Sequence, residues 1–272
     1  MREGRAADSA IANPSGSRTR PDHLVEARGV EMTYPGGVTA LAGIDIGFRQ
    51  GQLTTLLGPS GCGKTTLLKI VAGLIEPTAG EILISGRPVR GPGPERAFVF
   101  QDFALMPWAT VLRNVAFGLE LRGVPKAERE ETARRCIAEV RLAGFEHSYP
   151  HQLSGGMRQR VGLARALAVD AKVLLMDEPF SAVDEQTRRK FQEDLLGLIA
   201  EANKTFIFVT HSIEEAVYVS DRIVLLSPRP GRVDRVIDLY IPREGDPEAI
   251  RRDPVYLDTV EHIWQGLKHY VE

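Results

Sequence analysis

Two stretches of this chain combine small and polar residues in the way that anion binding requires. The first is GPSGCGKTT, which follows the apolar run QLTTLL. Its three glycines allow consecutive backbone N–H groups to turn inward, and a helix that begins here adds the positive end of its dipole. Lys64 is then placed to reach the outer phosphates of a nucleotide, and the Thr65 hydroxyl to coordinate a phosphate-bound Mg²⁺. The predicted nucleotide-binding residues are Gly58, Pro59, Ser60, Gly61, Cys62, Gly63, Lys64, Thr65 and Thr66.

The alternative is a glycine-rich turn that binds nothing. The flanking sequence disfavours it, because a short apolar strand precedes the loop and a helical pattern follows, as phosphate loops require. The apolar positions of that helix are Leu67, Leu68, Val71 and Leu74.

The second stretch is LSGGMRQR, which begins at Leu153. A serine followed by two glycines at the start of a helix leaves N–H groups accessible and is another N-terminus suited to an anion. Ser154 is also an ordinary helix cap, and the two roles coexist.

An acidic pair supplies the third chemical element. The apolar strand that contains Val173 to Met176 ends in Asp177 and Glu178, and neighbouring residues of a strand point in different directions. Asp177 is therefore predicted to hold Mg²⁺ through water, and Glu178 to polarise a water molecule toward the terminal phosphate.

Cysteine use indicates neither a disulfide framework nor a zinc site, because Cys62 and Cys136 are the only two and lie far apart. By default Cys62 fills a variable position of the loop. A helix N-terminus lowers a thiol pKa, which leads to the hypothesis that thiol reagents inhibit the protein and that MgATP protects it.

Composition excludes several classes of partner and location. Lys and Arg number 34 against 36 Asp and Glu, for a formal charge of −2, and no segment is basic enough to neutralise a nucleic-acid backbone. No apolar run approaches the roughly 20 residues that span a bilayer. Residues 1–22 lack the apolar core of a secretory signal and are expected to form a disordered leader. We therefore predict a protein that stays in the cytosol.

The pattern of elements predicts an α/β fold. The chain from Leu24 to Phe48 alternates as an antiparallel pair, and strands are expected at Glu81 to Ser85 and Ala97 to Gln101 with a loop between them. Helical patterns dominate from about 102 to 170, after which strands and helices alternate, as in a mostly parallel sheet. The predicted domain is 23–241 with an inserted helical subdomain at about 102–170, followed by a helical extension at 242–272.

Over most of its length the chain resembles the nucleotide-binding domain of ATP-binding cassette (ABC) transporters, in which a P-loop core carries an antiparallel β layer and an inserted helical subdomain. The decisive element is LSGG, which other P-loop classes lack. The family's parts occur here in order as Tyr34, GPSGCGKTT, Gln101, LSGGM, VLLMDEP, SAVD at Ser181 to Asp184, and His211. Met157 and Val183 stand where Gln and Leu are commoner in relatives.

The resemblance implies ATP hydrolysis by a head-to-tail homodimer that closes on two ATP molecules with Mg²⁺. Ser154, Gly155 and Gly156 would contact the γ-phosphate held by the other copy. Tyr34 would stack on adenine, Asp184 would bridge the copies, and Gln101 would reach the Mg²⁺ and the water. His211 would contact the γ-phosphate and join Glu178 and Gln101 as the catalytic set.

The segment QDFALMPWATVLRNV is similar to cassettes of nitrate, sulfonate and taurine importers. This implies a peripheral subunit at the cytoplasmic face of the membrane, partnered by permease subunits and indirectly by an extracytoplasmic binding protein. The transported molecule itself never meets this chain. The alternatives are a soluble ABC ATPase of DNA repair or translation, and a P-loop kinase.

Two aromatic features are left open by the sequence. Trp108 is placed either on the docking surface for a membrane subunit or inside the helical lobe, and the residues favour neither. A stripe at helical spacing near the C-terminus is expected to pack onto the domain rather than serve a partner. It comprises Tyr256, Val260, Ile263, Trp264 and Leu267.

Overall fold

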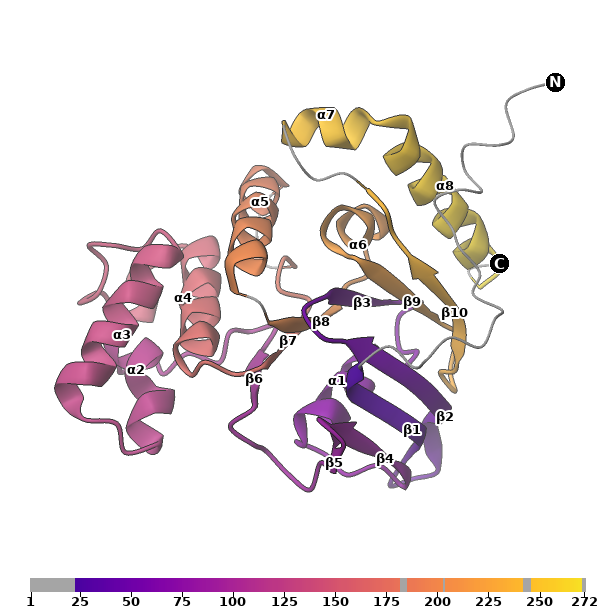
Figure 1. Cartoon of the computed structure of the whole chain (residues 1–272), viewed down its shortest axis with the longest axis horizontal. Coiled ribbons are helices and arrows are strands. Elements are labelled where there is room, and N and C mark those ends of the chain that lie inside the picture. The colour runs from indigo at the N-terminus through magenta and orange to yellow at the C-terminus, as the bar shows by residue number, and fades with distance from the viewer. Residues whose placement is uncertain (1–22, 182–184, 203, 242–245, 271–272) are drawn as a thin grey trace. The chain divides into compact units, whose positions relative to one another are not determined.

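The computed structural model describes residues 23–181, 185–202, 204–241 and 246–270, which form two compact units (Figure 1). The predicted leader at 1–22 lies outside the described residues. The first unit contains residues up to Pro92 and from Thr205 onward, and the second contains Gly93–Lys204. None of the helices that the structure describes is both long and apolar enough to cross a membrane.

The first unit begins with an antiparallel sheet whose strand order is β2-β1-β4-β5. The alternation in the sequence predicted the β1–β2 pair correctly, with Tyr34 opposite Val38 at the turn. The loop expected between the strands at Glu81 to Ser85 and Ala97 to Gln101 is partly wrong. Two of its residues, Arg87 and Pro88, pair with β4 as a short strand. These strands are β1 (His23–Tyr34), β2 (Val38–Arg49), β4 (Ala79–Ile84) and β5 (Arg87–Pro88).

The same unit contains a second group of strands, which carries the phosphate loop. β3 pairs in parallel with β8 on one side and β9 on the other, and β10 adds an antiparallel strand beyond β9. β3 and β8 are buried along their entire length, as their unbroken apolar and threonine runs require. The strands are β3 (Leu53–Leu57), β8 (Thr205–Val209), β9 (Arg222–Leu226) and β10 (Val233–Asp238).

The helices of this unit follow the predicted patterns with one correction. The helix after the phosphate loop ends at Ala72, because Gly73 adopts a left-handed conformation with φ of 74° that terminates it. Leu74 therefore lies outside the helix and is 42% exposed, so its predicted place in this helix is wrong. The helices are α1 (Lys64–Ala72), α6 (Ile213–Val219), α7 (Pro247–Arg252) and α8 (Pro254–Lys268).

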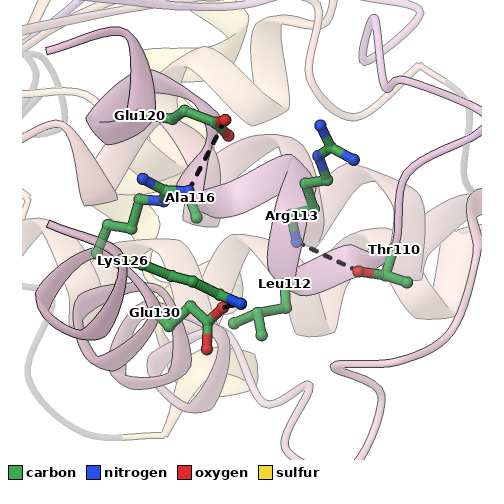
Figure 2. Close-up of a pocket in the computed structure, with 8 residues that line it drawn as sticks. Thr110, Leu112, Arg113, Ala116, Glu120, Lys126 and Glu130 are labelled. Carbon is green, nitrogen blue, oxygen red and sulfur yellow. Dashed lines mark hydrogen bonds and ion pairs between the residues drawn. The ribbon is translucent and has the colours of Figure 1, made fainter. Parts of the chain in front are cut away.

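The second unit is mainly helical and includes one parallel strand pair, β6 with β7. In it α2 packs on α3 and α4, and α4 also contacts α5. Between α2 and α3 lies a hollow of about 330 Å³ in which Lys126 faces Glu130 (Figure 2). The elements are β6 (Arg96–Val99), α2 (Val111–Leu121), α3 (Lys126–Glu139), a short 3₁₀ turn (Pro150–Gln152), α4 (Gly155–Ala168), β7 (Val173–Asp177) and α5 (Glu185–Ala202).

A buried amide shapes the segment that precedes α2. Asn114 is fully buried, and its Oδ1 accepts a hydrogen bond from the Met106 backbone N–H at 2.8 Å. Its Nδ2 donates to the carbonyls of Met106 and Ala109, at 3.2 and 3.0 Å. These bonds replace the secondary structure that the 102–110 segment lacks, and they fix the backbone on both sides of Trp108.

Replacing this amide tests its role. Asn114→Ala is expected to lower the free energy of unfolding by about 2 kcal/mol, because backbone groups of the 106–109 segment lose their partner inside the protein. Urea unfolding measured by circular dichroism gives the comparison. Arg113→Ala, at the exposed neighbouring position, serves as the control and should change stability by no more than about 0.5 kcal/mol. Equal effects of the two variants would contradict a structural role for Asn114.

Candidate nucleotide-binding and catalytic site

The phosphate loop joins β3 to α1, as the sequence predicted. Gly63 immediately precedes α1 with φ of 102°, and a Cβ at this position would lie 2.5 Å from the Leu41 side chain and 2.9 Å from the Ala40 carbonyl. Only glycine fits there. A Cβ at Gly61, in contrast, would meet no atom within 4 Å. The loop therefore closes tightly at its base, with open space at its middle.

Lys64 lies over this loop. Its ammonium donates hydrogen bonds to the carbonyl oxygens of Gly58 at 2.7 Å and Pro59 at 2.9 Å, and the residue is only 7% exposed. A buried cation above a loop with open space and a helix N-terminus are the features that an oligophosphate requires. The donor set of the loop therefore fits the phosphates of a nucleotide.

Two predicted ligands from elsewhere in the sequence lie in this unit. Tyr34, at the end of β1, has its hydroxyl 3.1 Å from the Thr66 hydroxyl, and the residue is 37% exposed. Its ring is therefore held beside the first turn of α1. His211 follows β8, whose Val209 is the parallel partner of Leu56 in β3. Since parallel strands end at one edge of the sheet, His211 and Gly58 line the same pocket.

The premise of the Cys62 hypothesis is wrong. Burial raises the pKa of the Cys62 thiol, and the Lys64 ammonium 3.8 Å away from the sulfur offsets this only in part. The side chain is 1% exposed. A buried, protonated thiol is a poor nucleophile, so Cys62 packs the base of the loop.

The second unit brings Gln101 and the acidic pair together. Val99 of β6 pairs in parallel with Met176 of β7, so the residues that follow these strands emerge side by side. Gln101 Nε2 donates to Glu178 Oε2 at 3.3 Å. Asp177, the last residue of β7, is 6% exposed, whereas Glu178 is partly exposed. The pair thus provides one sheltered carboxylate and one that solvent reaches.

Glu178 has a backbone conformation that the sequence did not indicate. Its φ is 46°, in the left-handed region that non-glycine residues rarely adopt. The Ser181 backbone N–H and hydroxyl both donate to the Glu178 carbonyl, at 3.2 and 2.9 Å. Ser181 therefore holds the Glu178 backbone in this conformation, a role that sequence reasoning missed although SAVD begins at this residue. Such strain is characteristic of functional sites.

The LSGG segment has the predicted geometry. Ser154 caps α4, and its hydroxyl accepts from the Met157 backbone N–H at 3.3 Å. Ser154 is exposed, and Gly155 and Gly156 are partly exposed. This helix N-terminus is therefore accessible from outside the chain. Asp184 lies outside the described residues.

Two further outcomes concern aromatic residues. Trp108 is 74% exposed, so its alternative place inside the helical lobe is wrong. Tyr256 and Ile263 of the C-terminal stripe are buried, and α8 packs on α6, which confirms the expected packing for these two residues. Trp264 of the same stripe is 46% exposed.

Comparisons with known proteins identify the family of the chain. Residues 41–181 match the family model described as ABC transporter. An ABC transporter ATP-binding protein of Methanocaldococcus jannaschii, MJ0412, is 53% identical over 213 residues, covering 78% of this chain and 80% of its own length. The taurine import ATP-binding protein TauB of Pseudomonas entomophila is 50% identical over 246 residues, covering 88% and 95%.

A solved structure supplies the fold and the type of activity. It is the dimeric, post-hydrolysis state of the ATP-binding cassette MJ0796 bound to ADP and phosphate. It matches with a TM-score of 0.71 and 33% sequence identity, covering 80% of this chain and 99% of that one. The predicted fold class and ATPase activity are confirmed. This chain belongs to the ABC transporter family, as an ATP-hydrolysing subunit.

Proposed function

We propose that this chain powers the import of a small sulfonate, of which taurine is the simplest candidate, through a separate membrane permease. The supporting observation is that the chain shares 50% sequence identity with a taurine import ATP-binding protein over 88% of its length. The importer segment around Trp108 and the phosphate loop with its LSGG counterpart agree with this. Nitrate and other small oxyanions are alternative transported substrates, because substrate selection belongs to other subunits.

ATP binding in this proposal begins with the first unit. The loop amides between Gly58 and Thr65 and the Lys64 ammonium bind the β- and γ-phosphates, and the ring of Tyr34 supports the adenine. The Lys64 ammonium already lies above the loop on two carbonyl oxygens. It therefore exchanges these partners for phosphate oxygens without a large movement of its side chain.

The residues proposed to hold Mg²⁺ are Thr65, Asp177 and Gln101. A hydroxyl and one carboxylate, completed by phosphate oxygens and water, are a typical magnesium ligand set. No cluster of three or more His, Cys, Asp or Glu side chains suited to a metal occurs among the described residues. This agrees with an ion that depends on the nucleotide for part of its coordination. When bound, it would neutralise charge on the phosphate oxygens.

Hydrolysis is assigned to the carboxylate of Glu178. It accepts a proton from water while the water oxygen bonds to the γ-phosphorus, and the bond from that phosphorus to the bridging oxygen of ADP breaks. Gln101, which donates to Glu178 Oε2, orients the carboxylate and the water. His211 stabilises charge on the γ-phosphate, as do Ser154, Gly155 and Gly156 of a second copy, with Asp184 at the same junction.

This assignment predicts the effect of removing the carboxylate. Glu178→Gln is expected to bind ATP normally but to lower turnover by about 10²-fold or more, the scale of a lost transition-state contact. Phosphate release and nucleotide affinity are the two measurements. Glu128→Gln, the same change at an exposed position of α3, is the control. Near-normal hydrolysis by Glu178→Gln would move the catalytic role to another residue.

Partner binding is proposed for the surface around Trp108. This indole is 74% exposed and stands on a backbone that Asn114 fixes. A rigidly presented, exposed tryptophan is an effective interface anchor. We therefore assign the permease contact to this segment.

A matched pair of variants tests the contact. Trp108→Ala is expected to weaken permease binding by roughly 10-fold or more, as truncation of an anchor does, and to retain its ATP affinity. Leu121→Ala is the control, because Leu121 is 73% exposed at the opposite end of α2. Permease-stimulated ATPase activity in liposomes, with the binding protein and taurine present, is the measurement. Equal stimulation of both variants would place the contact elsewhere.

The transport reaction is tested by adding the proposed substrate, taurine, to the assembled complex. The chain, co-purified with its permease and binding protein, should hydrolyse ATP faster when taurine is added, and the retained ligand can be identified by mass spectrometry. Stimulation by nitrate alone would replace the sulfonate with another oxyanion. Phosphorylation of a metabolite, or stimulation by nucleic acid without a permease, would instead support one of the rival classes.

A further inference from the structure

We propose that the last turns of α8, through Trp264 and Leu267, form part of the surface on which a second copy of this chain closes when ATP is bound. This rests on the proposed function, in which two copies share the nucleotide. It adds a C-terminal element, outside the nucleotide-binding motifs, to the contact between the copies.

The inference starts from a pocket of about 520 Å³ in the first unit. One wall is the phosphate loop at Gly58, Pro59 and Ser60, together with His211. The other wall is the end of α8, with Trp264, Leu267 and Lys268. The C-terminal helix therefore borders the phosphate loop directly, although some two hundred residues separate them in the sequence.

The first half of α8 is firmly anchored on α6. The Tyr256 hydroxyl donates to the Glu214 carbonyl at 3.1 Å, and burial raises the pKa of this phenol to about 12, so it remains a donor. Thr259 and Ile263 are also buried. Figure 1 shows α8 beside α6 and β10, and His262 Nε2 lies 3.4 Å from Arg235 Nη1 of β10. The end of the helix is consequently held in place, not left to move freely.

The second half of α8 carries apolar surface that its own unit leaves uncovered. Trp264 is 46% exposed, and the Lys268 ammonium lies 5.6 Å from the centre of its ring. Leu267 and Ile213 extend the apolar lining, with His211 and Lys268 at polar positions of the same pocket. An apolar centre with charged or polar neighbours is the usual composition of a protein–protein interface.

A second copy is the occupant that the surroundings favour. The phosphate loop and His211 form one wall, so any molecule that covers the γ-phosphate from outside must approach beside Trp264. The related cassette with ADP and phosphate is a dimer. A copy that closes over this loop therefore meets α8, and the position of Trp264 continues that interface outward. Covering an exposed indole would then favour the closed, ATP-bound dimer.

The experiment uses the full chain in the Glu178→Gln background, in which bound ATP is expected to be consumed about 10²-fold more slowly. Sedimentation velocity over a range of protein concentrations measures dimer dissociation with and without MgATP. Adding Trp264→Ala is expected to raise the dimer dissociation constant roughly 10-fold or more, with ATP affinity at low protein concentration unchanged. Adding Leu121→Ala instead, a truncation of a side chain that is 73% exposed at the end of α2, is expected to leave the constant within about twofold.

The outcomes distinguish the role of α8 in the dimer from the proposed function, in which two copies share the nucleotide. If the parent Glu178→Gln chain stays monomeric with MgATP, the proposed shared nucleotide site fails. If it dimerises and Trp264→Ala leaves the dissociation constant unchanged, only the role of α8 is overturned. Trp264→Phe guards against a folding defect, because it keeps an aromatic ring in place and is expected to weaken the dimer less than the alanine variant.

Fluorescence provides an independent reading, because the chain has two tryptophans. In Glu178→Gln with Trp108→Phe, only Trp264 emits, and MgATP is expected to shift its emission to shorter wavelength as the dimer forms. In Glu178→Gln with Trp264→Phe, the emission of Trp108 should not follow dimer formation. A shift of Trp264 that does not depend on protein concentration would show closure within one chain and would overturn the proposal.

Discussion

The parallel pairing of β3 with β8 is the constraint on which the nucleotide site of the first unit depends. It joins two sequences about 150 residues apart, with Leu56 opposite Val209, and so brings the phosphate loop and His211 to the same sheet edge. The β6–β7 pair has the same effect in the second unit, where it places Gln101 beside Glu178. In both units the candidate site residues lie just beyond the carboxyl ends of parallel strands, where the backbone no longer pairs with neighbouring strands.

α6 connects this edge to the C-terminal helix. It begins two residues after His211, and its start is fixed by Ser212, whose hydroxyl accepts from Glu215 N–H. Thr210 adds a 2.6 Å hydrogen bond to the Glu215 carboxylate. Because α8 packs on α6, the position of His211 and that of α8 are set by one element.

Much of the fold could be predicted from local patterns. The phosphate loop between a strand and a helix, the β1–β2 alternation and the helical stripe of α8 each follow from periodicity and turn residues within about twenty positions. The errors are also local. Leu74 was assigned to α1 because its apolar spacing fits, although Gly73 ends the helix before it. Arg87 and Pro88 read as a loop because two residues give no period, yet β4 provides a pairing edge.

The sequence by itself determined which groups are present for phosphate chemistry, because the glycines, Lys64, Ser154 and the Asp177–Glu178 pair are defined by residue type and short spacing. It also determined the family. The tertiary structure decided the environment of these groups. Cys62 lies just before the start of α1, which would lower its pKa, but long-range packing buries it and raises that pKa. The sequence allowed Trp108 to lie inside the helical lobe and led us to expect Trp264 to pack onto the domain. Only the folded chain shows that each retains exposed surface. Burial and desolvation depend on residues distant in the sequence, and no local pattern contains them.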